Sequence, residues 1–105
     1  MCIRDRCKTL NKQPNIKITL TKNIPVGAGL GGGSSDIAAT IKALLMLWNA
    51  KITQDKLDAL LLSLGADVPA CFHGESCLIE GIGENITSIP CPTLHGVLIL
   101  SLIHI

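Results

Sequence analysis

The first regular pattern along the chain is an alternation of apolar and polar residues at positions 16–21. Ile16, Ile18 and Leu20 fall on one side of this segment, and lysine and threonine fall on the other. A period of two is typical of a strand with one buried face. The segment therefore predicts a half-buried strand, which ends before Pro25 because proline cannot donate to a strand ladder.

Beyond the following glycine-rich run, apolar residues recur at helical spacing. They are Ile37, Ile41, Leu44, Leu45 and Trp48. Ser34, Ser35 or Asp36 can cap the start of this helix, because their short side chains accept hydrogen bonds from unpaired amides. The opposite face is mainly alanine, so we expect a helix that is mostly buried and ends near residues 49–50.

A second helix is predicted to begin after Thr53, whose hydroxyl suits an N-cap, with Asp55 at the positive end of the helix dipole. Its apolar stripe consists of Leu57, Leu60, Leu61 and Leu64. Gly65 follows where a left-handed glycine commonly ends a helix. The pattern thus predicts two helices joined by a short turn.

The last third of the chain predicts β-structure. Residues 76–80 and 84–89 flank a Gly-Ile-Gly turn, which indicates a hairpin. Residues 96–100 form a short apolar run that predicts a central strand. The order strand, loop, helix, helix, hairpin, strand is compatible with an α+β fold.

Composition and charge narrow the range of partners. The chain has 105 residues, is 48% hydrophobic and carries a formal net charge of +1, which suits one small domain and argues against disorder. There is no stripe of basic residues, and Trp48 and Phe72 are the only aromatic residues, so a nucleic-acid partner is not favoured. No apolar run is long enough to span a membrane, and no signal-peptide pattern opens the chain.

The cysteines form an odd set without a Cys-x-x-Cys pair. They are Cys2, Cys7, Cys71, Cys77 and Cys91. Because metal-ligand spacing is missing, we expect free thiols, no metal held by these residues, and a reducing compartment such as the cytoplasm.

The two ends of the chain differ in character from their neighbours. MCIRDR at residues 1–6 and LSLIHI at residues 100–105 can be written from the two strands of one DNA duplex, which resembles a transposon-end adapter used in preparing sequencing libraries. We expect both ends to derive from that adapter, so they carry no weight in the fold prediction. Residues 7–99 are then an internal piece of a longer protein. Native codons that continue past these points in the source locus would contradict this expectation.

The most unusual stretch is NIPVGAGLGGGSSD, at residues 23–36, where glycines lead directly into a helix. Ordering glycine costs conformational entropy, so a dense run suggests that a ligand approaches the backbone closely. Bare amides and the positive end of a helix suit an anion, most simply a chain of phosphates. A P-loop is excluded because no lysine follows the glycines. Gly27, Gly29 and Gly32 satisfy a dinucleotide fingerprint, but a helix is predicted where that motif needs a second strand.

The residues PVGAGLGGGSSDIAA, at positions 25–39, resemble the phosphate-binding motif of the GHMP kinases, a family that includes galactokinase and the homoserine, mevalonate and phosphomevalonate kinases. The triple glycine and the segment LGADVPACFHG, at positions 64–74, narrow the resemblance to one group within this family. Both are similar to the members of the family that act on 4-diphosphocytidyl-2-C-methyl-D-erythritol in non-mevalonate isoprenoid synthesis. KITLTKNIP before the loop, the Leu47-Trp48 pair and GIGE at positions 81–84 occur in the same order, so the resemblance covers essentially everything between the two ends.

This resemblance implies an ATP-dependent transfer of the γ-phosphate to the 2-hydroxyl of that substrate. Mg²⁺ is expected to help neutralise the phosphates, with Ser34 or Ser35 near it. The implied fold is part of the GHMP kinase N-terminal domain, of the ribosomal protein S5 domain 2-like type, with helices packed on a mixed sheet. ATP and the small-molecule substrate are the implied partners, without nucleic acid or membrane, and no oligomeric state follows.

The resemblance also assigns site residues. The phosphate-binding residues are Pro25, Val26, Gly27, Ala28, Gly29, Leu30, Gly31, Gly32, Gly33, Ser34 and Ser35. Asp67 is the implied catalytic base, since a carboxylate within hydrogen-bond reach can accept the proton of a weakly nucleophilic alcohol. Without the resemblance, Asp67 is more simply a helix cap before Val68-Pro69, and the two serines are caps as well.

Two parts of the family pattern are absent from the chain. These are the Pro-Ala-Lys-Ile-Asn-type stretch, whose lysine pairs with the catalytic aspartate, and the C-terminal domain. One hypothesis is therefore an inactive internal fragment of this kinase or of another GHMP-family kinase. The other is a non-catalytic module that binds phosphate or nucleotide. A lone fragment is also expected to expose apolar strand surface.

Overall fold

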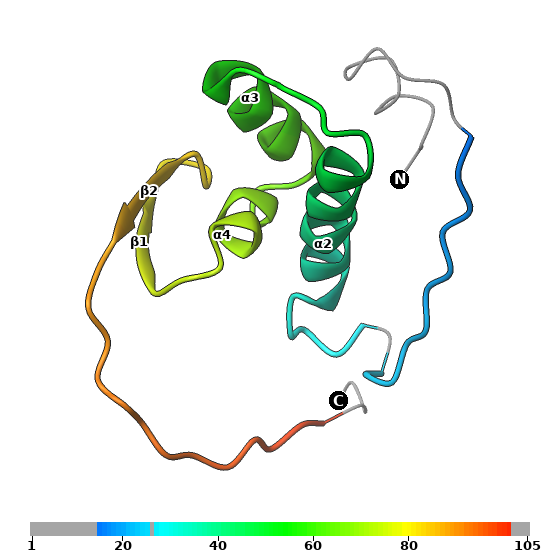
Figure 1. The fold of residues 1–105 in the computed structure, drawn as a ribbon. Helices are drawn as coiled ribbons and strands as arrows, with labels where there is room; N and C mark the ends of the chain where they lie inside the picture. The colour runs from blue at the N-terminus through cyan, green and yellow to red at the C-terminus, as the bar shows by residue number, and fades with distance from the viewer. Residues whose placement is uncertain (1–14, 26, 102–105) are drawn as a thin grey trace.

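The computed structural model describes residues 15–25 and 27–101, and Figure 1 shows the helices gathered together with a β-hairpin beside them. The elements are α2 (Gly32–Leu47), α3 (Gln54–Leu64), α4 (Val68–His73), β1 (Cys77–Glu80) and β2 (Asn85–Ser88). This combination confirms the α+β class. Within the described residues the sheet is one antiparallel pair, without the parallel pairing that the implied mixed sheet would add. Val26, Cys2, Cys7 and all of the adapter-like residues except 100 and 101 lie outside the described residues.

Helix α2 begins earlier than predicted. Its N-cap is Gly31, whose backbone is left-handed (φ 71°, ψ 20°) and whose carbonyl accepts the amide of Ser35 at 3.0 Å. No side chain caps this helix, so the prediction that Ser34, Ser35 or Asp36 caps it is wrong. The glycine backbone turns directly into the first helical turn, and the two serines therefore lie inside the helix.

Helix α2 is buried along one side only. Ala38, Ile41 and Leu44 are buried, whereas Met46 and Leu47 at its end are 81% and 65% exposed. The prediction of a mostly buried helix is therefore wrong for the part of the chain that the structure describes. A helix is buried only where another element packs on it, and α4 packs on one face of α2.

Helix α3 forms where the pattern predicts it. Thr53 is the N-cap, and its hydroxyl accepts a hydrogen bond from the Lys56 amide at 3.4 Å. Leu57 and Leu61 of the predicted stripe are buried. The predicted left-handed conformation of Gly65 is wrong, because its φ of 159° and ψ of 151° are nearly extended. An extended residue at this point lets the chain turn back so that Val68 reaches the core.

Replacing Thr53 by alanine is expected to lower the free energy of opening of α3 by about 1 kcal/mol, because one amide of the first turn loses its acceptor. Hydrogen–deuterium exchange of the α3 amides in the full-length protein measures this change. Thr53→Ser keeps an acceptor oxygen and is the matched control. Equal protection in the alanine and serine variants would show that the cap contributes nothing.

The short helix α4 joins the other two helices in one core. The cluster of buried side chains consists of Ile41, Leu57, Leu61 and Val68, which come from α2, α3 and α4. Lys42 of α2 also places its Nζ 5.1 Å from the centre of the Phe72 ring of α4. Burying an aliphatic side chain stabilises a fold by about 1.5–3 kcal/mol. The core therefore fixes the start of α4 relative to α2 and α3.

The predicted hairpin is confirmed. β1 and β2 pair antiparallel, with Cys77 opposite Ser88 and Glu80 opposite Asn85. The amide of Ile89 donates to the carbonyl of Ser76 at 3.1 Å, which extends the pairing by one step. The residues between the strands are the predicted Gly-Ile-Gly and Glu84.

The strands predicted over residues 16–21 and 96–100 are not formed, and these two predictions are wrong for this chain. Figure 1 shows both segments running without a strand beside them. A strand needs a neighbour that takes up its backbone hydrogen bonds, and neither segment has one among the described residues. Their apolar side chains are consequently exposed, with Leu20 at 62% and Ile99 at 90%, which confirms the expected exposure of apolar strand surface. Among all the residues that the structure describes, none of the helices is both long and apolar enough to cross a membrane.

Candidate functional site

A cavity of about 320 Å³ lies over the glycine run that leads into α2. Its lining residues are Lys22, Ile24, Pro25, Gly27, Ala28, Gly29, Leu30, Gly31, Gly32, Gly33 and Ser34. The structure thus brings together the predicted phosphate-binding residues except two. Val26 lies outside the described residues, and Ser35 lines an adjoining cavity together with Lys22 and Asp36.

The backbone of the glycine run alternates in handedness. Gly27, Gly29 and Gly31 have φ angles of 76°, 76° and 71°, whereas Ala28 and Leu30 between them do not have positive φ. An L side chain in the left-handed region costs roughly 1–2 kcal/mol, so these three positions favour glycine for conformational reasons. Alternation of this kind turns successive amides toward one side and forms a concave surface that binds anions.

The first turn of α2 adds more donors to the same surface. The amide of Ser35 is the first to find a carbonyl within the helix, that of Gly31. The amides of Gly32, Gly33 and Ser34 therefore have no carbonyl four residues before them in the helix. The helix dipole places about half a positive charge at this end, which favours an anion over the cavity.

Gly32 and Gly33 are glycines that the fold does not require. Both lie inside α2 without positive φ, and a Cβ on Gly33 would meet nothing within 4 Å. A Cβ on Gly32 would lie 3.5 Å from the Nζ of Lys22, which is an ordinary contact. Alanine is more stable than glycine within a helix by roughly 0.5–1 kcal/mol. The packing of the protein therefore does not account for glycine at these two positions, and the space above their backbone is open.

Lys22 is the one charged residue among those lining this cavity, and sequence reasoning missed it. Its Nζ lies 2.6 Å from Oδ2 of Asp36, and the two side chains are 32% and 36% exposed. An exposed ion pair contributes about 0–1 kcal/mol, so a phosphate can replace Asp36 as the partner of Lys22 at small cost. The two residues are 14 positions apart, and Lys22 lies before the glycine motif. The signal in the sequence was its place in KITLTKNIP, the stretch directly before the glycine run.

Asp67 lies at the N-cap of α4, is exposed, and makes no cap hydrogen bond with that helix. The simple interpretation as a helix cap therefore lacks its hydrogen bond. Asp67 is not among the residues that line the cavity over the glycine run. Asp67 and the glycine run are linked indirectly. Asp67 immediately precedes α4, and the glycine run leads into α2. These two helices pack together.

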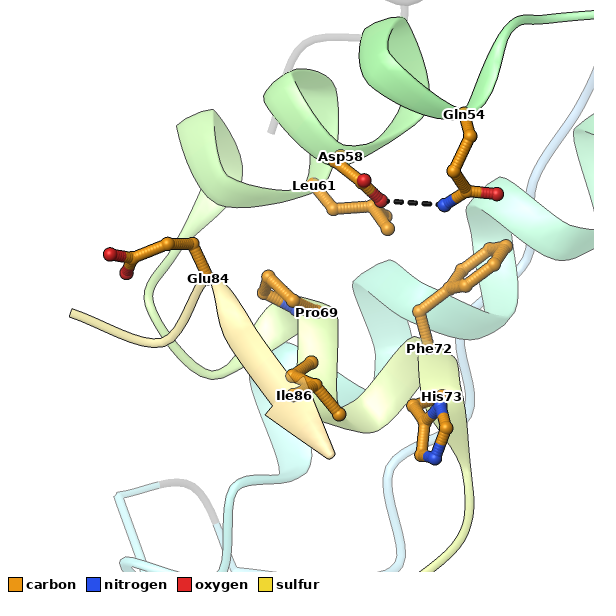
Figure 2. Close-up of a pocket in the computed structure, with 8 residues that line it drawn as sticks. All are labelled: Gln54, Asp58, Leu61, Pro69, Phe72, His73, Glu84 and Ile86. Atoms are coloured by element: carbon orange, nitrogen blue, oxygen red, sulfur yellow. Dashed lines mark hydrogen bonds between the residues drawn. The ribbon is translucent and has the colours of Figure 1, made fainter. Parts of the chain in front are cut away.

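A second cavity, of about 260 Å³, lies between α3, α4 and the hairpin (Figure 2). Asp58 and His73 on its wall are already paired, Asp58 with Nε2 of Gln54 at 2.6 Å and Nε2 of His73 with the hydroxyl of Ser88 at 2.9 Å. The Glu84 carboxylate points away from it in Figure 2. Asp58 and His73 of this groove are thus already paired within the protein, whereas the cavity over the glycine run is lined mainly by glycines.

Among the described residues, no His, Asp, Glu or Cys side chain lines the cavity over the glycine run. Across residues 15–25 and 27–101, no three His, Cys, Asp or Glu side chains gather into a group that could hold a metal ion. Cys71, Cys77 and Cys91 are free thiols. The donors that this site offers to an anion are thus backbone amides and the ammonium group of Lys22.

The sequence is similar to proteins of known family. The family model for the GHMP kinases N terminal domain matches residues 2–75. The chain is 47% identical over 91 residues to the 4-diphosphocytidyl-2-C-methyl-D-erythritol kinase of Sinorhizobium medicae, which covers 86% of this chain and 30% of that protein. Kinases of the same name from Geobacillus sp. and Psychromonas ingrahamii are 52% and 54% identical over 73% and 67% of the chain.

The chain spans less than a third of the length of these relatives, at 30%, 27% and 25%. The part that the family model covers includes the glycine run, all of α2 and α3, and Asp67. The chain therefore belongs to the GHMP kinase family and carries sequence of its N-terminal domain.

Proposed function

We propose that this chain contributes the nucleotide-binding segment of an ATP-dependent, cytoplasmic kinase that phosphorylates the 2-hydroxyl of 4-diphosphocytidyl-2-C-methyl-D-erythritol. The observation that carries the proposal is the pair Gly32 and Gly33 at the start of α2. The fold does not require glycine there, and a polyphosphate would bind the bare backbone amides. The names of the similar kinases support the substrate. The free thiols of the described cysteines support a reducing compartment.

In this proposal the glycine run holds the phosphates of ATP. Gly32, Gly33 and Ser34 line the cavity at the helix start, and Lys22 adds a positive charge to the same lining. Phosphoryl transfer depends mainly on positioning and on neutralising the charge of the phosphates. Mg²⁺ would supply further neutralisation, held mainly by the phosphates, and the hydroxyl of Ser34 or Ser35 is the chain's nearest oxygen ligand to offer.

The acceptor alcohol needs a base, and we assign this role to Asp67. Its carboxylate is exposed and is not used to cap α4, so it is available to a proton donor. General-base assistance of this kind contributes about 10²–10⁴-fold to a rate. The packing of α4 on α2 gives the base and the phosphate site a common rigid support.

The proposal is tested by incubating the full-length protein with ATP, Mg²⁺ and 4-diphosphocytidyl-2-C-methyl-D-erythritol. We expect ADP and the 2-phosphorylated product in equal amounts, identified by phosphorus NMR. Galactose, homoserine and mevalonate serve as competing acceptors. Turnover of one of these instead would identify another GHMP kinase, and ATP binding without any product would support the non-catalytic module.

Replacing Lys22 by alanine is expected to raise the KM for ATP by about threefold to tenfold, the effect of losing one partly exposed charge contact. The turnover number should change less, because the lysine contacts the nucleotide in both ground and transition states. Lys51→Ala, which removes an exposed lysine far from the cavity, is the matched control. An unchanged KM in the Lys22 variant would remove this residue from the site.

A further inference from the structure

The hairpin turn lies directly against the residue that precedes Asp67. Gly83 is buried although it belongs to a turn. A Cβ built on Gly83 would lie 2.9 Å from the carbonyl carbon of Ala66 and closer still to its oxygen. The φ of Gly83 is 124°, so an L side chain there is also strained. The contact is therefore one of backbone against backbone, and only glycine permits it.

The turn that carries Gly83 is closed by its own hydrogen bonds. Oε2 of Glu84 accepts the amide of Ile82 at 2.7 Å, and the amide of Gly83 donates to the carbonyl of Glu80 at 3.4 Å. Gly81 has a φ of 72°, and a Cβ on it would lie 2.6 Å from the carboxyl carbon of Glu84. The side chain of Glu84 is thus folded over its own turn. The turn presents a stiff surface to Ala66.

The hairpin also contacts the other end of α4. Ser88, at the end of β2, places its hydroxyl 2.9 Å from Nε2 of His73, the last residue of α4. Between these contacts, Ile86 of β2 and Pro69 of α4 line the same groove, and Figure 2 shows them beside one another. A helix of 6 residues is not stable alone, so its position depends on such neighbours. The hairpin braces α4 at both of its ends.

We propose that Gly83 is a positioning residue for Asp67. Because Gly83 has no side chain, the hairpin turn packs directly on the Ala66 peptide, and this contact holds the carboxylate of the next residue, Asp67, in place. The inference rests on the proposed function, which makes Asp67 the base. A general base must lie within hydrogen-bond reach of the proton that it removes. A displacement of about 1 Å can cost on the order of 100-fold in rate. Ala66 is joined directly to Asp67, so a side chain that pushes its carbonyl away moves the base.

The test compares Gly83→Ala with Gly81→Ala in the full-length protein. For Gly83→Ala we expect the turnover number to fall about 10-fold or more, with the KM for ATP within about twofold, because the phosphate site lies on another helix. Gly81→Ala introduces the same side chain into the same turn, also at a positive φ (72°), but the atoms it meets belong to the flexible end of Glu84. Its turnover number should fall by no more than about fivefold, because the substitution displaces the Glu84 carboxylate but places no atom against Ala66.

A double-mutant cycle separates positioning from general loss of structure. In the Asp67→Asn background, Gly83→Ala should cause no further fall in turnover, because the base through which it acts is gone. A further fall of the same size would mean a structural role only. Full turnover in Gly83→Ala, or an equal loss in Gly81→Ala, would overturn the inference.

If Gly83→Ala does not accumulate as folded protein, the Glu84→Ala variant tests the same inference. It removes the acceptor of the Ile82 amide and loosens the turn without adding an atom against Ala66. We then expect turnover to fall by about twofold to fivefold, again with the KM for ATP unchanged and with no effect in the Asp67→Asn background. Unchanged turnover would overturn the inference. Full activity of Asp67→Asn itself would instead refute the proposed base, so the two failures are distinguishable.

Discussion

Asp67→Asn is expected to lower the turnover number of the full-length kinase by about 10²–10⁴-fold, the range that a general base contributes. Asparagine has nearly the same shape and is an equally good residue at a helix N-cap, so α4 should keep its place. The carboxylate makes no cap hydrogen bond, so the substitution removes none. The loss should therefore appear in turnover, while the affinity for ATP stays unchanged. Steady-state kinetics and nucleotide titration measure the two quantities separately.

The matched control for this variant is Asp58→Asn. Asp58 is an exposed aspartate on the adjacent helix α3, hydrogen-bonded to Gln54 at 2.6 Å and outside the cavity over the glycine run. We expect its turnover to stay near that of the unmodified protein. Comparable turnover in the Asp67 and Asp58 variants would mean that another group removes the proton, and the assignment of Asp67 as base would be wrong.

Gly33→Ala is expected to weaken ATP binding by about 10-fold to 100-fold, because the added methyl group keeps a phosphate from approaching the backbone amides. This range corresponds to losing one hydrogen bond to a charged phosphate. The protein should meanwhile be no less stable. Gly33 lies in a helix, lacks positive φ and has no other atom within 4 Å of the place that a methyl group would take, so the substitution strains nothing in the ligand-free protein. Isothermal titration with ATP and thermal unfolding without ATP measure the two effects.

Two further glycines make this prediction specific. Gly96→Ala adds a methyl group at another open position without positive φ, outside the cavity, and should leave ATP binding unchanged. Gly31→Ala should weaken binding and also destabilise the protein, because its φ of 71° disfavours an L residue. Undiminished ATP affinity in Gly33→Ala would show that the phosphates do not pack on this backbone, and the proposed function would lose its main support.

The parts of the fold that the sequence predicts well are those that local interactions specify. The leucines of α3 recur at helical spacing, and the Thr53 hydroxyl reaches an amide three residues away, so both are visible within one short window. The hairpin is similarly local, because glycines 81 and 83 supply the positive φ angles of the turn. Helix α4 was harder to foresee, since it has only 6 residues and contains a proline.

The predictions of strands over residues 16–21 and 96–100 failed for the opposite reason. The alternation in residues 16–21 shows which side chains share a face, but a strand forms only against a neighbour that the pattern cannot name. The buried extent of α2 depended likewise on which elements pack against it. Its apolar residues suggested burial on every side, whereas α4 covers one face.

For the candidate site, the order of residues was enough to indicate an anion-binding glycine run, and the resemblance to the GHMP kinases added Asp67. The glycine run is visible in the sequence because its amides and the helix start that follows lie close together along the chain. Tertiary packing alone placed Lys22 over the glycines, 14 residues from its partner Asp36, and set Gly83 against Ala66. Contacts between distant segments are chosen by the whole core and leave no local periodicity, so they become visible only once the chain is folded.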